Sequence, residues 1–168
     1  MSPAGSPVVR DAVPEDLPET LDLLFANWRQ TYAPLIGAAA VERLLVDQHS
    51  VEVLQTQLDA RPVAFLSALL DGRLVGHAYA YDREDGCYLE RLHVASGLRG
   101  HGLGKTLLHG VLARCPAGTG VSLEVIDGNA AAVRFYEREG FAVVRRVSAE
   151  QGSCGAPAIV MRRPAATP

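Results

Sequence analysis

The sequence predicts an α+β fold, with a mixed, mostly antiparallel central sheet flanked by helices. Segments with helical periodicity alternate along the chain with short apolar segments typical of strands. The dipeptide Asp71-Gly72 lies between two such strands and favours a tight hairpin, so these strands should run antiparallel. A glycine-rich turn at residues 99–104 joins a further strand to a helix. The length of 168 residues suits one domain, which we expect to span residues 8–163 between flexible tails at residues 1–7 and 164–168.

The N-terminal third is predicted to hold one short strand and three helices. The strand covers residues 8–13, and Pro14 suits the first turn of the helix that follows it. Apolar residues recur at helical spacing from Leu17 to Tyr32, and we expect the segment 34–37, which begins with proline, to end this helix. Two further helices are expected at residues 38–47 and 50–59.

Three successive antiparallel strands are predicted to lead up to the glycine turn. They cover residues 63–70, 74–81 and 87–94. The elements expected after the turn are a helix at 103–114, a strand at 120–126, a helix at 129–139 and strands at 141–147 and 158–162.

Composition and charge exclude several classes of function. With 48% hydrophobic residues the chain can build a sizeable core. A net charge of −3 without any basic run argues against nucleic acid as the main partner, and no segment has the roughly 20 apolar residues of a membrane span. The first seven residues lack the features of a signal peptide, and the odd number of dispersed cysteines predicts a reducing compartment, the cytoplasm. Cys87, Cys115 and Cys154 are far apart in the sequence and lack metal-ligand spacing, so we expect small buried side chains and no metal site.

The glycine turn has the composition of an anion site. Glycines at 100, 102 and 104 leave backbone N–H groups accessible at a helix N-terminus, where the helix dipole favours a phosphate. A tight turn without a ligand is the alternative. The P-loop motif does not fit, because Arg99 stands where that motif needs glycine. The dinucleotide pattern G-x-G-x-x-G does not fit either, because residue 105 is lysine.

Two segments together resemble the GNAT superfamily of N-acyltransferases. Arg99, Gly102 and Gly104 match the family's acyl-CoA-binding pattern Arg/Gln-x-x-Gly-x-Gly/Ala. Residues 129–141, with Asn129 at the start and Phe135-Tyr136 in the middle, resemble a second family segment that ends in Gly-Phe. Both motifs occur in the family's order, and the resemblance covers residues 8–162.

The resemblance implies acetyl-CoA as cosubstrate. Its pyrophosphate would lie on the glycine turn, and its pantetheine arm would pair with the backbone of Leu92 and Val94 like an added strand. Asn129 would bond that arm, and it would also cap its helix. The predicted cofactor-binding residues are Leu92, His93, Val94, Arg99, Gly100, His101, Gly102, Leu103, Gly104, Lys105 and Asn129.

Tyr136 and Glu90 are the predicted catalytic residues. A phenol with an unperturbed pKa of about 10 is protonated at neutral pH and can donate to a departing thiolate. Glu90 matches an acidic position on the family's central strand and would be the base. Strict alternation groups Glu90 with the apolar Leu92 and Val94, so a β-bulge would be needed to redirect it; a surface or ion-paired glutamate is the alternative. His93 is a weaker candidate base.

The predicted activity is N-acetylation by direct transfer from acetyl-CoA to an unidentified primary amine in a ternary complex. The amine could belong to a small molecule or a peptide, and a homodimer is compatible with this prediction. In the family the first helices line the acceptor site, which makes Trp28 and Tyr32 candidate substrate contacts, with core packing as the alternative. A noncatalytic acyl-CoA sensor and a nucleotide-phosphate binder are the alternative functions.

Overall fold

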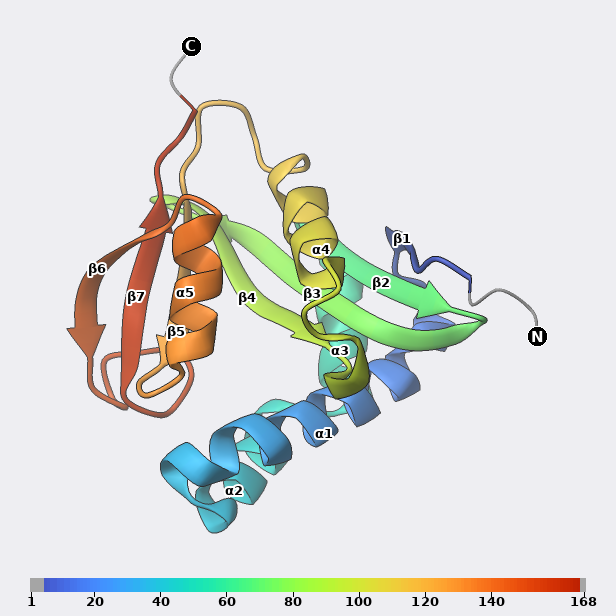
Figure 1. Ribbon diagram of the computed structural model, residues 1–168, viewed down its shortest axis with the longest axis horizontal. Helices are drawn as coiled ribbons and strands as arrows, with labels where there is room; N and C mark the ends of the chain where they lie inside the picture. The colour runs from blue at the N-terminus through green and yellow to red at the C-terminus, as the bar shows by residue number, and fades with distance from the viewer. Residues whose placement is uncertain (1–4, 167–168) are drawn as a thin grey trace.

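The computed structural model describes residues 5–166, so residues 1–4 and 167–168 of the predicted tails lie outside the described part of the chain (Figure 1). The strands are β1 (Val8–Asp11), β2 (Ala64–Leu70), β3 (Arg73–Arg83), β4 (Gly86–Val94), β5 (Val121–Ile126), β6 (Ala142–Val147) and β7 (Ala158–Arg163). The helices are α1 (Leu17–Ile36), α2 (Ala38–Gln48), α3 (Val51–Asp59), α4 (Leu103–Leu112) and α5 (Ala130–Arg138).

All the strands join one sheet in the order β1-β2-β3-β4-β5-β7-β6. Only the pairing of β4 with β5 is parallel among these strands, and every other pair is antiparallel. The predicted mixed, mostly antiparallel sheet flanked by helices is therefore confirmed. No helix within residues 5–166 is long and apolar enough to cross a membrane.

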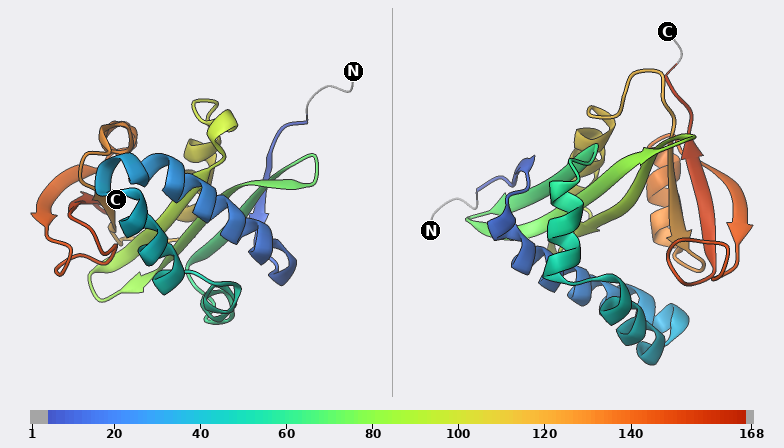
Figure 2. Two further views of the ribbon diagram at one scale, coloured as in Figure 1. Left: turned by 90° about the horizontal axis from the view of Figure 1, so that it is seen from below. Right: turned by 180° about the vertical axis from the view of Figure 1, so that it is seen from behind.

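Helices cover both faces of the sheet. Helices α4 and α5 lie on one face, and α1 and α3 cross the other, as the opposite views in Figures 1 and 2 show. Alternation along β2 and β3 divides their side chains between these two cores. Leu66 and Ala78 pack on the α4 side, whereas Phe65 and Tyr79 pack against residues of α1 and α3.

The hairpin between β2 and β3 has the predicted two-residue turn. Asp71 and Gly72 both have positive φ, at 50° and 78°. This is the backbone of a turn whose twist matches the flanking strands, and an Asp-Gly dipeptide adopts it at little cost. The turn fixes the register of β2 against β3.

The first helix differs from its prediction. Helix α1 continues through Pro34 to Ile36 and ends at Gly37, where φ is 90°. The prediction that the segment 34–37 breaks the helix is therefore wrong for its first three residues. Proline removes one hydrogen bond here, but it does so in the last turn, where packing of Tyr32 and Ile36 against α2 compensates.

Strands β4 and β5 diverge after a short parallel pairing. They pair only at Cys87–Val121 and Tyr88–Ser122 among the described residues. Beyond that point residues 89–94 of β4 lack a neighbouring strand on the β5 side, and the two strands separate in Figure 1. Unpaired strand edges inside a protein need hydrogen-bonding partners, so this gap is a place where an extended ligand can bind.

Candidate active site

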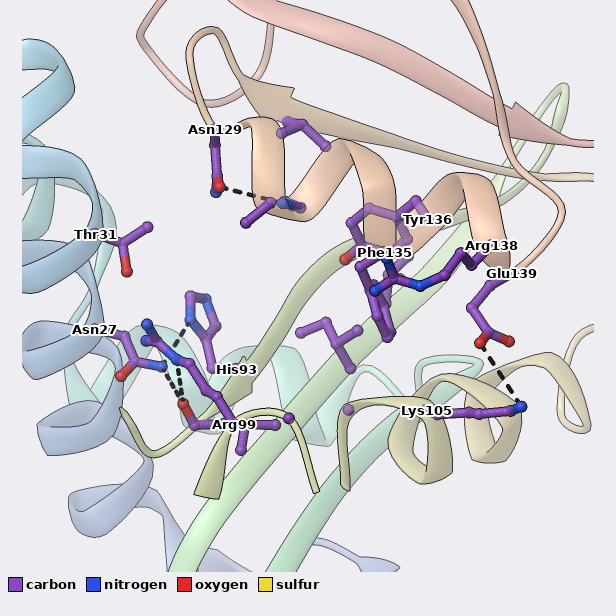
Figure 3. A pocket seen from close by; sticks show the side chains of 18 of the residues that line it. Asn27, Thr31, His93, Arg99, Lys105, Asn129, Phe135, Tyr136, Arg138 and Glu139 are labelled. Atoms are coloured by element: carbon purple, nitrogen blue, oxygen red, sulfur yellow. Dashed lines mark hydrogen bonds and ion pairs between the residues drawn. The ribbon is translucent and has the colours of Figure 1, made fainter. Parts of the chain in front are cut away.

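A cavity of about 700 Å³ opens at the divergence of β4 and β5. Side chains from α1, β4, the glycine turn, β5 and α5 line it, and Figure 3 shows how they converge. Such a volume is in the range of small-molecule sites in proteins. The segments that the sequence singled out around residues 90, 100 and 136 therefore contribute to one cavity.

The outer edge of β4 presents main-chain groups to this cavity. The Ala95 N–H donates to the Val75 carbonyl of β3 at 2.9 Å, so the Val94 carbonyl, in the same peptide unit, points the opposite way. Leu92 shares this orientation because it lies two residues earlier in the strand. The Val94 carbonyl accepts hydrogen bonds from Asn27 Nδ2 at 3.0 Å and from Arg99 Nε at 3.2 Å.

The glycine turn is open on the cavity side. Gly100 and Gly102 have φ of 78° and 86°, and a Cβ at either would meet no atom within 4 Å. Gly102 is the N-cap of α4, so the first N–H groups of that helix and its dipole lie at the cavity. A Cβ at Gly104 would lie 3.7 Å from the Phe135 ring. The turn therefore has the bare backbone that close approach of an anion requires.

The charges around the turn are mostly positive. Arg99, Lys105 and Arg138 line the cavity together with Glu139. The Lys105 ammonium lies 4.0 Å from the Glu139 carboxylate, and a dashed line in Figure 3 marks this ion pair. Because Lys105 is well exposed, this pair is weak and leaves the lysine available to an anion.

Two predicted cofactor residues do not line the cavity with their side chains. Leu103 is 6% exposed and packs in the core beneath α4. His101 is exposed, and its Nδ1 lies 2.9 Å from the Arg99 carbonyl. Leu103 would therefore contact a ligand at the turn only through its main-chain N–H group.

Helix α5 brings Asn129 and Tyr136 to the cavity. Asn129 caps the helix as predicted, since its side-chain oxygen accepts from the Ala132 N–H at 3.3 Å. The Tyr136 ring packs edge-on against Phe135 and Phe141, with centroids 5.1 and 5.4 Å away. Burial, and to a lesser extent the nearby Tyr32, raises the pKa of Tyr136, so its phenol is protonated at neutral pH.

Glu90 is the extra residue of a β-bulge. Tyr79 pairs with Arg91 and Ala80 with Leu89, which leaves Glu90 without a partner on β3. The bulge takes Glu90 off the apolar face of β4, and the residue lines the cavity. Its carboxylate also lies 3.0 Å from the Arg91 guanidinium, so the ion-paired alternative raised by the sequence has a partner in the structure.

Arg91 is buried behind Glu90. Its side chain is 3% exposed, and it donates to Gln57 Oε1 at 2.6 Å and to His77 Nε2 at 3.2 Å. Burial lowers the pKa of Arg91 to about 10, which still leaves it charged at neutral pH. A buried guanidinium needs an anion, and Glu90 supplies it while remaining at the cavity wall.

His93 lines the cavity but carries no charge at neutral pH. Burial lowers the pKa of His93 to about 3, with a smaller contribution from the Arg91 charge. Its Nδ1 lies 3.5 Å from Asn27 Nδ2. A histidine in this state is a poor proton acceptor for an amine.

The two predicted substrate residues differ in position. Tyr32 lines the cavity, whereas Trp28 does not and is 7% exposed in the core between α1 and α2. The Trp28 ring packs edge-on against Tyr32 at 4.8 Å. The core-packing alternative therefore accounts for Trp28.

Glu124 and Asn27 are among the cavity residues that the sequence analysis did not identify. Glu124 of β5 lines the cavity, and its carboxylate accepts a hydrogen bond from the Ser153 N–H at 2.8 Å. Alternation along β5 places the Glu124 side chain on the other face of the strand from the buried Leu123 and Val125. That this face borders the cavity depends on the divergence of β4 and β5, which the sequence does not reveal. Asn27 is 4% exposed within a helix, and a buried polar residue there is the only signal that could have indicated it.

The chain matches the model of a known protein family. The profile described as the acetyltransferase (GNAT) family matches residues 23–141. The chain belongs to this family. The resemblance seen in the sequence is thereby confirmed, and membership makes acetyl transfer the reaction class and acetyl-CoA the donor.

Solved structures of GNAT enzymes share the fold. The PaiA N-acetyltransferase of Thermoplasma acidophilum, in complex with coenzyme A, has a TM-score of 0.78 at 22% identity, covering 95% of this chain and 99% of that one. The ribosomal-protein-S18-alanine N-acetyltransferase of Escherichia coli has a TM-score of 0.69 at 19% identity, with coverage of 97% and 96%. Naa50 of Arabidopsis thaliana, in complex with the bisubstrate analogue CoA-Ac-MVNAL, has a TM-score of 0.69 at 18% identity, with coverage of 95% and 99%.

Proposed function

We propose that this GNAT protein is an N-acetyltransferase that moves the acetyl group of acetyl-CoA directly to a primary amine within a ternary complex. The observation that carries the proposal is the joint position of the open glycine turn, the unpaired β4 edge, Tyr136 and two carboxylates around one cavity. We also propose that residues 8–163 form the catalytic domain and that the protein works in the cytoplasm. A homodimer stays a prediction.

The donor would bind along β4 and the glycine turn. The N–H groups at the start of α4, with Lys105 and Arg138 beside them, suit a pyrophosphate. The main-chain groups of Leu92 and the N–H of Val94 face the gap beside β4 and suit an extended amide-containing arm. The Val94 carbonyl already accepts hydrogen bonds from Asn27 and Arg99, so it would contribute least.

Glu90 is the proposed base for the acceptor amine. An alkylamine is mostly protonated at neutral pH, so attack on the thioester requires loss of a proton. Glu90 lines the cavity close to the point where β4 and β5 begin to diverge, and Glu124 lies on β5. Together these carboxylates favour a cationic acceptor, and either could receive the proton directly or through one water.

Leu92 and Tyr136 would act on the thioester. As the nitrogen–carbon bond forms, negative charge develops on the carbonyl oxygen, and the Leu92 N–H is oriented to stabilise it. As the carbon–sulfur bond breaks, the Tyr136 hydroxyl would protonate the departing thiolate. Its raised pKa keeps the proton available at neutral pH.

The sequence predicts a small-molecule amine or a peptide as the acceptor, and the names of two solved relatives support the peptide. One relative is a ribosomal-protein alanine N-acetyltransferase, and another binds a bisubstrate analogue that contains a peptide. A third is named PaiA N-acetyltransferase. We therefore propose a small-molecule amine or a peptide N-terminus as the acceptor class.

Calorimetry followed by a turnover assay tests the proposal. We expect acetyl-CoA to bind and ATP to compete poorly, because the turn lacks the P-loop glycine. Release of free CoA should then depend on an amine from a panel of polyamines, amino acids and short peptides. Acetyl-CoA binding with no turnover on any amine would favour the acyl-CoA sensor, whereas tight ATP binding would favour the nucleotide-phosphate binder.

A further inference from the structure

Two cysteines that are far apart in the sequence lie in contact outside the cavity. The sulfurs of Cys87 and Cys115 are 2.7 Å apart and share a hydrogen bond. Cys87 begins β4 and is 1% exposed, while Cys115 follows the last turn of α4 and is partly exposed. Neither residue lines the cavity, so their contact has no part in the proposed transfer reaction.

Main-chain bonds hold both cysteines in place. The Cys87 N–H donates to the Gly120 carbonyl at 3.0 Å, and the Cys115 N–H donates to the Val111 carbonyl at 3.1 Å. A sulfur–sulfur bond is about 2.05 Å long, so the two side chains would need to move together by less than about 1 Å. Cys154 provides a contrast, because its sulfur faces the Ala156 carbonyl at 3.4 Å and no other thiol.

The two thiols differ in reactivity. The sulfur–sulfur hydrogen bond lowers the pKa of Cys115, while the same interaction and burial raise the pKa of Cys87. Since the thiolate is the reactive form, Cys115 is the thiol that an oxidant would meet first. Cys87 is then already in position to react with the oxidised sulfur.

We propose that Cys87 and Cys115 form a reversible intramolecular disulfide when a hydroperoxide oxidises the protein. The Cys115 thiolate attacks the peroxide oxygen, the oxygen–oxygen bond breaks, and Cys115 becomes a sulfenic acid. The Cys87 sulfur then displaces water from this sulfenic acid and the sulfur–sulfur bond forms. In total two thiols lose two hydrogens, and hydrogen peroxide is reduced to two waters.

The disulfide would close a loop that contains the cofactor-binding segment. Residues 88–114 lie between the two cysteines and include Glu90, the unpaired β4 edge and the glycine turn. Closing this loop restricts the unfolded chain and ties the start of β4 to the end of α4. Because both cysteines lie outside the cavity, we expect greater stability with unchanged affinity for acetyl-CoA.

Peptide mapping of the full chain tests the site. Reduced protein is treated with hydrogen peroxide, remaining thiols are alkylated, and peptides are identified by mass spectrometry. We expect a Cys87–Cys115 linked peptide that disappears after treatment with dithiothreitol, and an alkylated Cys154. Oxidation of Cys115 beyond sulfenic acid without a link, or a link that involves Cys154, would overturn the proposal.

Thermal unfolding tests the consequence. The melting temperature of the oxidised wild type should exceed that of the reduced protein by several degrees, and at most by roughly 15 °C. The Cys115→Ser variant should show no such rise, and Cys154→Ser should behave like wild type. An unchanged or lower melting temperature in the linked wild type would contradict the stabilising role, as would a rise in the Cys115→Ser variant.

Discussion

Replacing Gly104 by alanine should move stability and cofactor affinity in opposite directions. Gly104 lies in the first turn of α4 and has no positive φ, and a Cβ there would lie 3.7 Å from Phe135 and 3.8 Å from Val94. These are ordinary contact distances, so the substitution introduces no clash. Alanine favours a helix over glycine by up to about 1 kcal/mol, which corresponds to a rise in melting temperature of roughly 2–4 °C.

The same methyl group would occupy space at the predicted pyrophosphate site. If it costs one hydrogen bond between a backbone N–H and a charged phosphate oxygen, the loss is about 1.5–3 kcal/mol. That predicts an affinity for acetyl-CoA that is roughly 10- to 100-fold weaker. Gly102 is a less informative position, because its φ of 86° would add backbone strain to any substitution.

Calorimetric titration with acetyl-CoA and thermal unfolding are the two measurements. Gly97→Ala is the matched control, because a Cβ at Gly97 meets nothing within 4 Å and this residue does not line the cavity. The control should bind acetyl-CoA like wild type. A folded Gly104→Ala variant with wild-type affinity would refute the assignment of the anion site, and an equal loss in both variants would point to a general effect on the turn.

Three further predictions test the catalytic residues and one buried carboxylate. Tyr136→Phe should leave acetyl-CoA binding intact and lower kcat by ~10²–10⁴-fold; a wild-type kcat would remove Tyr136 from catalysis. Glu90→Gln should lower kcat/KM most at low pH, where free amine is scarce, with partial recovery at higher pH. The decrease in kcat/KM should be larger for Glu90→Gln than for Glu124→Gln; the reverse order would assign the base to Glu124. Burial alone would raise the pKa of Asp16, but hydrogen bonds from Arg10, the Val13 N–H and Ser67 lower it. The stability that ionised Asp16 contributes is present above about pH 4 and is lost as the pH falls further. Asp16→Asn should therefore lower the free energy of unfolding by about 1–3 kcal/mol at pH 7. In denaturant titrations between pH 5 and 3 this variant should lose less stability than the wild type, and equal losses would contradict the assignment.

Local signals in the sequence were sufficient for most of the fold. The Asp71-Gly72 turn determines the pairing of its two strands without any distant contact, and the apolar period of α4 identifies its buried face. Pro34 was misjudged because its effect depends on packing against α2, which helical periodicity does not reveal. Local propensity is overridden where tertiary contacts compensate for a lost hydrogen bond.

The site could be predicted only where a motif or a local backbone requirement marked it. The glycines of the turn and Tyr136 belong to recognisable segments, and the structure brings both to one cavity. Glu124 and Asn27 could not be identified in this way, because their positions at the cavity depend on how β4 and β5 diverge and how α1 packs against β3 and β4. Spatial adjacency between distant segments has no short-range sequence signal.

The bulge at Glu90 explains how two adjacent charged residues occupy different environments. If β4 alternated strictly from Leu89, the side chains of Arg91 and His93 would enter the apolar core beneath α4, and Leu92 would face α3. A guanidinium in that core would lack both Gln57 and a carboxylate, which is costly for a buried charge. One extra residue instead returns Leu92 to the α4 core and sends Arg91 toward α3. The same residue leaves Glu90 at the cavity wall, in contact with Arg91. The position of the proposed base therefore follows from the requirement to bury Leu92 and to pair Arg91.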